Sequence, residues 1–375
     1  MTTLMQASTQ WASRPNDERF TSLDELVAHT AHQRSISGSK VIPTRRSGQL
    51  MLEARPIEED TTRRSLVLCG PDGIPAAPNH WSFGQLCARA DFPAGPLRTL
   101  PADIAADVLN YKMLHKRVED MGVLVRRDPA TGIIELAAAT GPNYGRIWNH
   151  EVALAMRERF GDGVTGDFTV PGEFGVALDR ITKENTTIFA GDRDMFVFLA
   201  DEKNRIEIPN RRHGRSGSLA RGVFVWNSEV GSKTFGIGTF LFDYACCNRI
   251  VWGAEGYQEI TVRHTVSAPE RFLEEVMPAI ESYAHKSSDS ITAAITAAQQ
   301  ARIKEEDVDT FLKGRFTRNQ AVAIKAAHMA EEDRPIESIW DVTTGATAYA
   351  RGIKWQDERV DIERKAGAIM ALASK

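Results

Sequence analysis

Residues 191–253 constrain the fold of this chain most strongly, because apolar runs of strand length alternate there with turn-forming residues. The runs rich in β-branched and aromatic residues are 194–199, 205–208, 222–226 and 234–242, followed by 248–252 and 258–264. A turn at 201–204 separates the first two runs, and residues 227–233 separate the next two. We therefore predict two antiparallel hairpins in this segment.

The length and composition describe an ordinary globular protein. A chain of 375 residues with 42% hydrophobic and 26% charged residues can bury a sizeable core, and its length suggests about two or three domains. The formal net charge of −4 excludes a polyelectrolyte, so any affinity for nucleic acid has to come from local clusters of Lys and Arg.

The cysteine count and the absence of long apolar segments indicate the compartment. Four cysteines are too few for a disulfide scaffold, and the adjacent Cys246 and Cys247 match no metal-ligand spacing. No apolar run reaches the roughly 20 residues that a membrane-spanning helix needs, and residues 1–20 lack the pattern of a signal peptide. We expect a cytoplasmic protein that does not contact a membrane.

Three regions follow from the patterning. Residues 1–62 predict a polar N-terminal arm, residues 63–285 an α+β core in which helices pack on an antiparallel sheet, and residues 286–375, which are Ala-rich and poor in strand signals, a helical C-terminal region. Helices are expected at 81–90, 101–116, 150–160 and 268–284, with four more after residue 286.

Capping residues support these helices. Ser22 with Glu25, Ser267 with Glu270 and Thr317 with Gln320 have the spacing of capping boxes, and single caps are expected at Asn79, Asn149 and Ser338. A further hairpin is predicted from residues 122–126 and 132–136.

The most suggestive chemical feature is a cluster of cations around residues 209–220, a segment too polar and glycine-rich to be core, which we predict to be a mobile loop. Against one acid, Glu207, the wider segment from Lys203 to Arg221 has six cations: Lys203, Arg205, Arg211, Arg212, Arg215 and Arg221. Such side chains can follow a phosphate backbone, and the nearby Trp226 can stack on a base. The alternatives are a solvated hairpin tip and an aromatic side chain buried in the core.

Familiar catalytic motifs are absent from the sequence. There is no phosphate-binding P-loop, no nucleophile elbow and no H-E-x-x-H helix. Gly236 and Gly238 lack the third glycine of a dinucleotide fingerprint, so we expect a neighbouring backbone to approach closely there.

Two weaker sites remain as candidates. Asp192 and Asp194 would share one face of a strand and, with Glu173 and Asp179, could hold Mg²⁺ for nuclease or phosphoryl-transfer chemistry; the alternative is a turn with a local ion pair. The cysteine pair with His264 could form a thiolate or metal site, or pack as small buried side chains.

The order of several short motifs resembles a known family. The motifs are residues 80–87 (HWSFGQLC), 149–152 (NHEV), 193–199 (RDMFVFL), 227–231 (NSEVG), 247–253 (CNRIVWG), 338–343 (SIWDVT) and 346–351 (ATAYAR). From about Ser65 to the C-terminus the chain resembles the phage/plasmid-like proteins of domain-of-unknown-function family 932. The resemblance implies a mobile-element setting, such as a prophage or a plasmid, and it supplies no catalytic residues.

These observations lead to one functional expectation and two alternatives. We expect a non-catalytic DNA-binding protein that binds or anneals single strands and has no metal or other cofactor. The sequence leaves open whether it also forms a homo-oligomer. A looser, fold-level analogy links it to single-strand annealing proteins. The alternatives are a metal-dependent enzyme acting on nucleic acid through Asp192 and Asp194, and an oligomeric interaction protein without a nucleic-acid partner.

Overall fold

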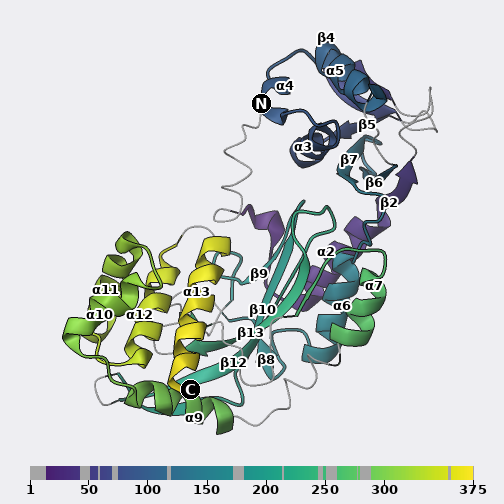
Figure 1. Cartoon of the computed structure of the whole chain (residues 1–375). Helices are drawn as coiled ribbons and strands as arrows, with labels where there is room; N and C mark the ends of the chain where they lie inside the picture. Colours follow the sequence, from purple (N-terminus) through teal and green to yellow (C-terminus); the bar gives the residue numbers. More distant parts are fainter. Residues whose placement is uncertain are drawn as a thin grey trace.

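The computed structural model describes residues 14–42, 51–57, 60–69, 75–115, 120–171, 181–212, 215–243, 248–250, 260–276, 278, 289–353 and 356–374. These residues form two mostly antiparallel sheets with helices packed against them, which confirms the α+β class. Figure 1 shows the smaller sheet at the top with α3, α4 and α5, and the larger sheet below it between two groups of helices.

The smaller sheet has the strand order β2-β6-β7-β5-β4-β3, and only β5 and β7 run parallel. Its strands are β2 (Ser37–Ile42), β3 (Met51–Ile57), β4 (Asp60–Cys69), β5 (Pro75–Pro78), β6 (Met121–Arg127) and β7 (Ile134–Thr140). Its helices are α3 (His80–Arg89), α4 (Ala94–Leu97) and α5 (Ala102–His115). Leu86 of α3 and Leu109 of α5 are fully buried in the core between helices and sheet.

The larger sheet contains nine strands among the described residues, with the central order β1-β9-β10-β12-β13-β14. Strand β8 also pairs with β10, β11 with β12, and β15 with β13. The strands are β1 (Arg19–Phe20), β8 (Phe168–Thr169), β9 (Ile188–Ala190), β10 (Met195–Asp201), β11 (Ile206–Arg212), β12 (Arg215–Asn227), β13 (Phe235–Asp243), β14 (Asn248–Ile250) and β15 (Ile260–Val262).

Alternating side chains give the larger sheet two different faces. Aliphatic residues such as Val197 and Val223 point to one face and pack against α2 (Leu23–Ser35), α6 (Asn149–Phe160) and α7 (Ala268–Arg271), which continues as a π-helical turn (Phe272–Val276). Aromatic residues point to the other face: Phe189, Phe196, Phe198, Phe224, Trp226, Phe240 and Phe242.

The C-terminal helices lie on the aromatic side of the larger sheet (Figure 1). They are α9 (Asp289–Gln300), α10 (Glu305–Lys313), α11 (Arg318–Glu332), α12 (Ile339–Arg351) and α13 (Gln356–Met370), followed by a 3₁₀ turn (Ala371–Ser374). Val360 of α13 belongs to the aromatic cluster, so this helix directly covers part of that face.

Most of the predicted helix ends are confirmed by their caps. The side chains of Ser22, Asn79 and Ser338 each accept a hydrogen bond from the backbone three residues on, and Thr317 with Gln320 forms a complete capping box. Ser267 makes no such bond, and its helix changes to a π-helical turn after Arg271.

One hairpin was predicted with the wrong partners. Strands β12 and β13 pair as expected, but β10 lies between β9 and β12, while β11 pairs with β12 beyond the end of β10. The segment predicted as a mobile loop therefore supplies the end of β11 and the start of β12. The reason is burial: Ile206, Ile208 and Leu219 pack against Ile291 and Ile295 of α9, which holds both strands in place.

Residues 14–69 are also more integrated than the predicted polar arm. Strand β1 pairs with β9, α2 buries Leu23 and Leu26 in the main core, and β2 pairs with β6. The expected boundary at residue 62 falls inside β4. A few large apolar side chains are enough to anchor a polar segment to the core. The prediction missed them because it relied on the average composition of the segment.

Candidate nucleic-acid interface

Acidic neighbours neutralise three of the six cations predicted to bind phosphate. Lys203 Nζ lies 2.7 Å from Asp167, and Arg205 Nη2 lies 3.9 Å from Glu202. Arg221 is buried, 3.4 Å from the buried carboxylate of Asp201.

The other three cations are on the β11–β12 hairpin, where Arg212 and Arg215 face each other in register. Arg211 lies beside Arg212 on β11, and the side chains of all three lie outside the described part of the structure. The described side chains therefore do not form the single cationic surface that was predicted.

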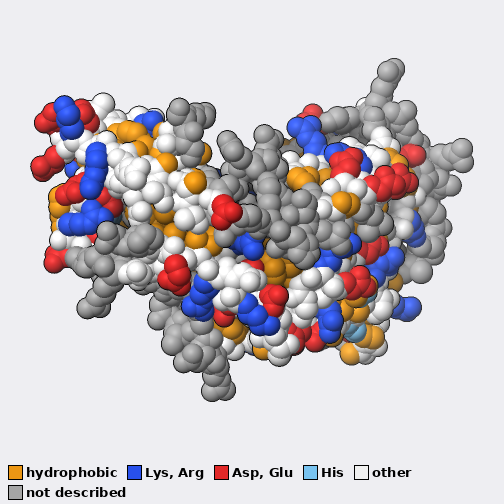
Figure 2. Space-filling view, turned by 90° about the horizontal axis from the view of Figure 1, so that it is seen from below, with side chains coloured by type: hydrophobic (Ala, Val, Ile, Leu, Met, Phe, Trp, Pro, Cys, Tyr) orange, Lys and Arg blue, Asp and Glu red, His pale blue; other side chains and the backbone are white. Residues whose placement is uncertain are grey.

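Surface charge is mixed over the face of the molecule seen from below. Figure 2 shows Lys and Arg side chains interspersed with Asp and Glu on this face. Binding of a polyanion to the described residues of this face would consequently depend on a local site.

Trp226 is only 7% exposed and belongs to the buried aromatic cluster, as one of the alternatives expected, but it also lines a pocket between the larger sheet and α13. The pocket has a volume of about 370 Å³ and is lined by Phe196, Phe224, Trp226, Lys233, Thr234, Thr261, Val360, Asp361 and Arg364. Three aromatic side chains from adjacent strands form the sheet wall, with Phe196 directly opposite Trp226 in register. The last three residues of the lining come from α13.

Cations approach the aromatic wall of this pocket. The Arg364 guanidinium carbon lies 5.5 Å from the centre of the Trp226 ring, and Lys233 Nζ lies 5.6 Å from the centre of the Phe196 ring. The carboxylate of Asp361 accepts a hydrogen bond of 3.3 Å from Arg364. Two cations and one exposed acid thus line the pocket beside its aromatic surface.

Glycines on β13 set the orientation of the aromatic rings. Gly236 pairs with Trp226 and Gly238 with Phe224, and a Cβ atom at either glycine would collide with the opposite ring. The rings therefore lie across bare backbone of the neighbouring strand, an arrangement that stabilises glycine within a sheet. The close approach predicted for this Gly-x-Gly pair exists, but it is made by aromatic rings and not by another backbone.

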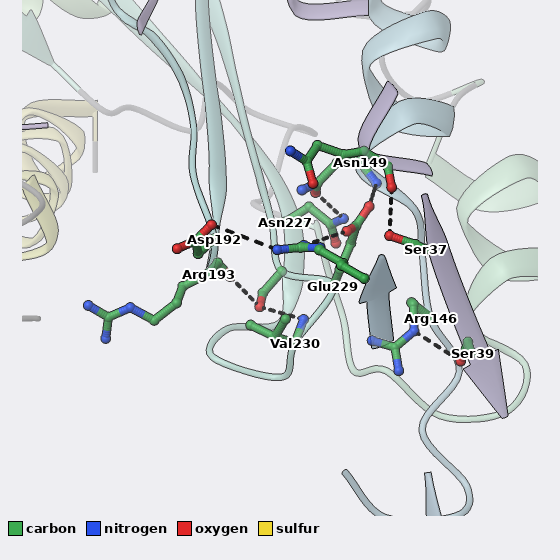
Figure 3. A network of polar contacts seen from close by, with 12 residues as sticks. Ser37, Ser39, Arg146, Asn149, Asp192, Arg193, Asn227, Glu229 and Val230 are labelled. Carbon is green, nitrogen blue, oxygen red and sulfur yellow. Dashed lines mark hydrogen bonds and ion pairs between the residues drawn. The ribbon is translucent and has the colours of Figure 1, made fainter. Parts of the chain in front are cut away.

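A buried polar network joins the two sheets through the loop at residues 227–231. Val230 O accepts hydrogen bonds from Trp81 Nε1 (3.1 Å) and Gln85 Nε2 (2.7 Å) of α3. Asn227 Nδ2 donates to Ile147 O and to Asn149 Oδ1, each at 2.8 Å (Figure 3).

Glu229 is the charged member of this network. Its carboxylate accepts hydrogen bonds from the backbone amide of Asn149 (2.8 Å) and from the guanidinium of Arg126 (3.3 Å). Asn149 was predicted to cap α6; it is instead the first residue of the helix, and Trp148 occupies the cap position. From the sequence, residues 227–231 stood out only as a short motif. Their role in joining the sheets was not predicted, because the residues they bind are distant in the chain.

The two described carboxylates proposed to bind Mg²⁺ each lie beside an arginine. Asp194 is buried and forms an ion pair with Arg14, whereas Asp192 is 70% exposed and lies 3.8 Å from Arg126. No group of three or more potential metal ligands occurs among the described residues. Glu173 and Asp179 lie outside them.

A third carboxylate lies near this pair. Burial raises the pKa of Glu18 to about 7, although Arg14 acts in the opposite direction and Asp192 and Asp194 reinforce the rise. Glu18 accepts a hydrogen bond of 3.2 Å from Arg14. Among the described residues, Glu18 and Asp194 thus share one arginine, Arg14.

His264, the described member of the proposed cysteine–histidine site, is half-buried against Tyr144. Its ring stacks on Tyr144 with 4.7 Å between centres, and Nδ1 lies 3.0 Å from Gly145 O, so this nitrogen donates to the carbonyl. Burial lowers the pKa of His264 to about 4. Cys246 and Cys247 lie outside the described residues, while Cys69 and Cys87 are free thiols.

The fold and pocket define an α+β protein with an aromatic, cationic pocket between an antiparallel sheet and a C-terminal helix. The chain belongs to the family described as domain of unknown function (DUF932), which matches residues 177–368 and so confirms the family resemblance. The matched region contains the central strands and most of the C-terminal helices. No curated protein and no solved structure matches the chain. Within its described residues no helix has the length and apolar character needed to span a bilayer.

Proposed function

We propose that this protein binds single-stranded nucleic acid without catalysing a reaction on it, and that the pocket between β12 and α13 receives one base of the strand. The observation that carries the proposal is the combination of an aromatic wall with Lys233 and Arg364 in one pocket. Aromatic faces beside cations are the general means by which proteins bind single strands without reading their sequence.

The size and charge of the pocket suit one nucleotide. Ligand pockets typically measure roughly 300–1,000 Å³, so about 370 Å³ is at the small end of that range. A base would stack at the Trp226 ring and displace the Arg364 guanidinium towards the adjacent phosphate. Arg364 pairs with Asp361, an exposed acid on its own helix, and a surface ion pair of this kind is weak.

The β11–β12 hairpin would provide secondary phosphate contacts. Its cations Arg211, Arg212 and Arg215 are all on strands that continue the same sheet as Trp226. In this proposal they add salt-dependent affinity along the nucleic-acid strand. Lys203, Arg205 and Arg221 instead form ion pairs with acidic neighbours.

The biological setting also remains a proposal. The phage/plasmid-like motifs suggest DNA of a prophage or plasmid as the target, and the free thiols Cys69 and Cys87 suggest the reducing cytoplasm.

Binding of labelled oligo(dT) to the full chain, followed by fluorescence anisotropy, tests the proposal. We expect tighter binding of oligo(dT) than of duplex DNA, and an affinity that falls steeply between about 50 and 200 mM salt. Lys233→Ala and Arg364→Ala should each weaken binding roughly five- to tenfold, since each removes a charge-assisted contact.

A matched control lies next to Arg364 on the same helix. Lys365 is near the ring of Phe316, away from the pocket, so Lys365→Ala should bind as the wild type does. No binding at low salt, or binding that both pocket variants leave unchanged, contradicts the proposed site. Mg²⁺-dependent cleavage of the oligonucleotide would support the enzyme alternative instead.

A further inference from the structure

Arg146 is a buried arginine that forms no ion pair with any described acid. It is only 8% exposed, and among the described residues no carboxylate lies within ion-pair distance of it. Its Nε donates one long hydrogen bond of 3.4 Å to Ser39 Oγ, and its Nη1 is buried with no hydrogen-bond partner.

The other buried arginines show how unusual this is. In the described part of the chain, the four others each form an ion pair with a carboxylate: Arg14 with Asp194, Arg126 with Glu229, Arg221 with Asp201, and Arg359 with Glu363. A buried charge is costly unless it is paired, so the fifth arginine calls for a counter-charge that the described residues do not supply.

Glu229 does not fill this role. Its carboxylate already binds Arg126 and the amide of Asn149, and it acts on Arg146 only at longer range. Figure 3 shows the guanidinium of Arg146 beside Ser39 and pointing away from Glu229. Burial also lowers the pKa of the Arg146 guanidinium, which reflects the same missing compensation.

A second arginine lies close to Arg146. Trp148 has the guanidinium carbon of Arg34 at 3.8 Å from its ring centre and that of Arg146 at 5.7 Å. Arg34 is exposed, and within the described residues it too has no ion pair. Two cations therefore contact one indole ring: Arg146 is buried and Arg34 is exposed to solvent.

We propose that Arg146 and Arg34 bind a phosphate group at the junction of the two sheets. Guanidinium groups match phosphate oxygens in geometry, and two cations balance the charge of a phosphate dianion. Ser39 Oγ would add a hydroxyl contact from β2. The inference is independent of the pocket at α13, because it uses different residues on another part of the molecule.

Titration of the full chain with inorganic phosphate, against sodium chloride at equal ionic strength, tests the inference by thermal unfolding and calorimetry. Phosphate should raise the Tm, because a ligand that binds only the native state stabilises it. Arg34→Ala should weaken phosphate binding at least roughly fivefold, and Arg146→Gln should abolish it.

Arg157→Ala is the control, since this exposed arginine of α6 already pairs with Asp24. If Arg146→Gln does not fold, the exposed Arg34 still permits the test. The inference is overturned if the wild-type Tm responds equally to phosphate and chloride, or if Arg34→Ala binds phosphate as tightly as the wild type.

A competition arm distinguishes the source of the phosphate. If phosphate lowers the affinity for oligo(dT), and Arg34→Ala lowers the affinity for both phosphate and oligo(dT), the site holds a phosphate of the nucleic acid. If phosphate binds without competing with oligo(dT), and Arg34→Ala lowers the affinity for phosphate but not for oligo(dT), the site holds a free phosphate compound. Both results support the anion site, and only the occupant differs.

Discussion

Arg126 of β6 and Glu229 of the β12–β13 loop form a buried ion pair of 3.3 Å that links the smaller sheet to the larger one. Val230, the next residue, accepts two hydrogen bonds from α3 and packs with Leu124, Ala137 and Ala138 of the smaller sheet. The loop that connects two central strands thus also positions the other sheet.

Replacing Glu229 should uncouple the sheets. Glu229→Ala removes the buried acidic partner of Arg126, leaves it only the exposed Asp192 at 3.8 Å among the described acids, and takes the acceptor from the amide of Asn149, so we expect a loss of about 3 kcal/mol in the free energy of unfolding. Urea denaturation followed by circular dichroism and fluorescence measures this loss, and non-coincident transitions would indicate separate unfolding of the two sheets.

The double variant Arg126→Met with Glu229→Leu is the companion experiment. It removes both charges and should recover part of the lost stability, because neither charge is then left buried alone. A double variant as unstable as Glu229→Ala would show that the Asn149 amide, and not the ion pair, carries the effect.

Gly236→Ala should displace the Trp226 ring. The new methyl group has no room against the indole, and overpacking of this kind costs about 1–3 kcal/mol. We also expect weaker binding of oligo(dT), since Trp226 lines the pocket. The Tm and the anisotropy titration measure the two effects.

Gly95→Ala is a suitable control for that substitution. Nothing lies within 4 Å of a Cβ atom placed at Gly95, so stability and binding should both remain close to the wild type. If Gly236→Ala behaves in the same way, the ring is free to move and does not depend on the glycine.

Glu18 should make the protein less stable as the pH rises. Folding raises the pKa of Glu18 from 4.5 to about 7. Its stabilising contribution to the free energy of unfolding is therefore fully present below about pH 4.5 and is lost as the pH rises through 7. Glu18→Gln should flatten the pH dependence between 4.5 and 7 and stabilise the protein at pH 8 by up to about 2 kcal/mol.

Denaturant unfolding at a series of pH values checks this sign. Glu158→Gln, at an exposed position of α6, should leave the slope in that window unchanged. A Glu18→Gln protein that follows the wild-type pH profile would place the titrating group elsewhere.

His264 should act in the opposite direction. Its pKa is lowered from 6.5 to about 4, so its contribution is present above about pH 6.5 and is lost as the pH falls towards 4. His264→Phe should retain the stacking on Tyr144 but remove the protonation, and should therefore reduce the loss of stability between pH 6.5 and 4. An unchanged acid-unfolding midpoint would contradict this assignment.

Local signals in the sequence predicted the elements better than their partners. The helix α11 was expected from its capping box, and the β12–β13 hairpin from two apolar runs with a short connection. The pairing of β10 was missed, because its neighbours β9 and β12 are selected by contacts with α6 and α13 that lie far away in the chain. The basic segment was identified as a group, yet acids at Asp167 and Asp201 became its partners only on folding.

The sequence by itself determined the α+β class, the capped C-terminal helices and the presence of aromatic residues on the central strands, because each depends on spacing between near neighbours. Only the tertiary structure decided which cations are neutralised, that Trp226 meets Arg364, and that buried Arg146 has no ion pair with a described acid. Those relationships join residues as far apart in the chain as Trp226 and Arg364, and packing in a shared core, which no local pattern encodes, brings them together.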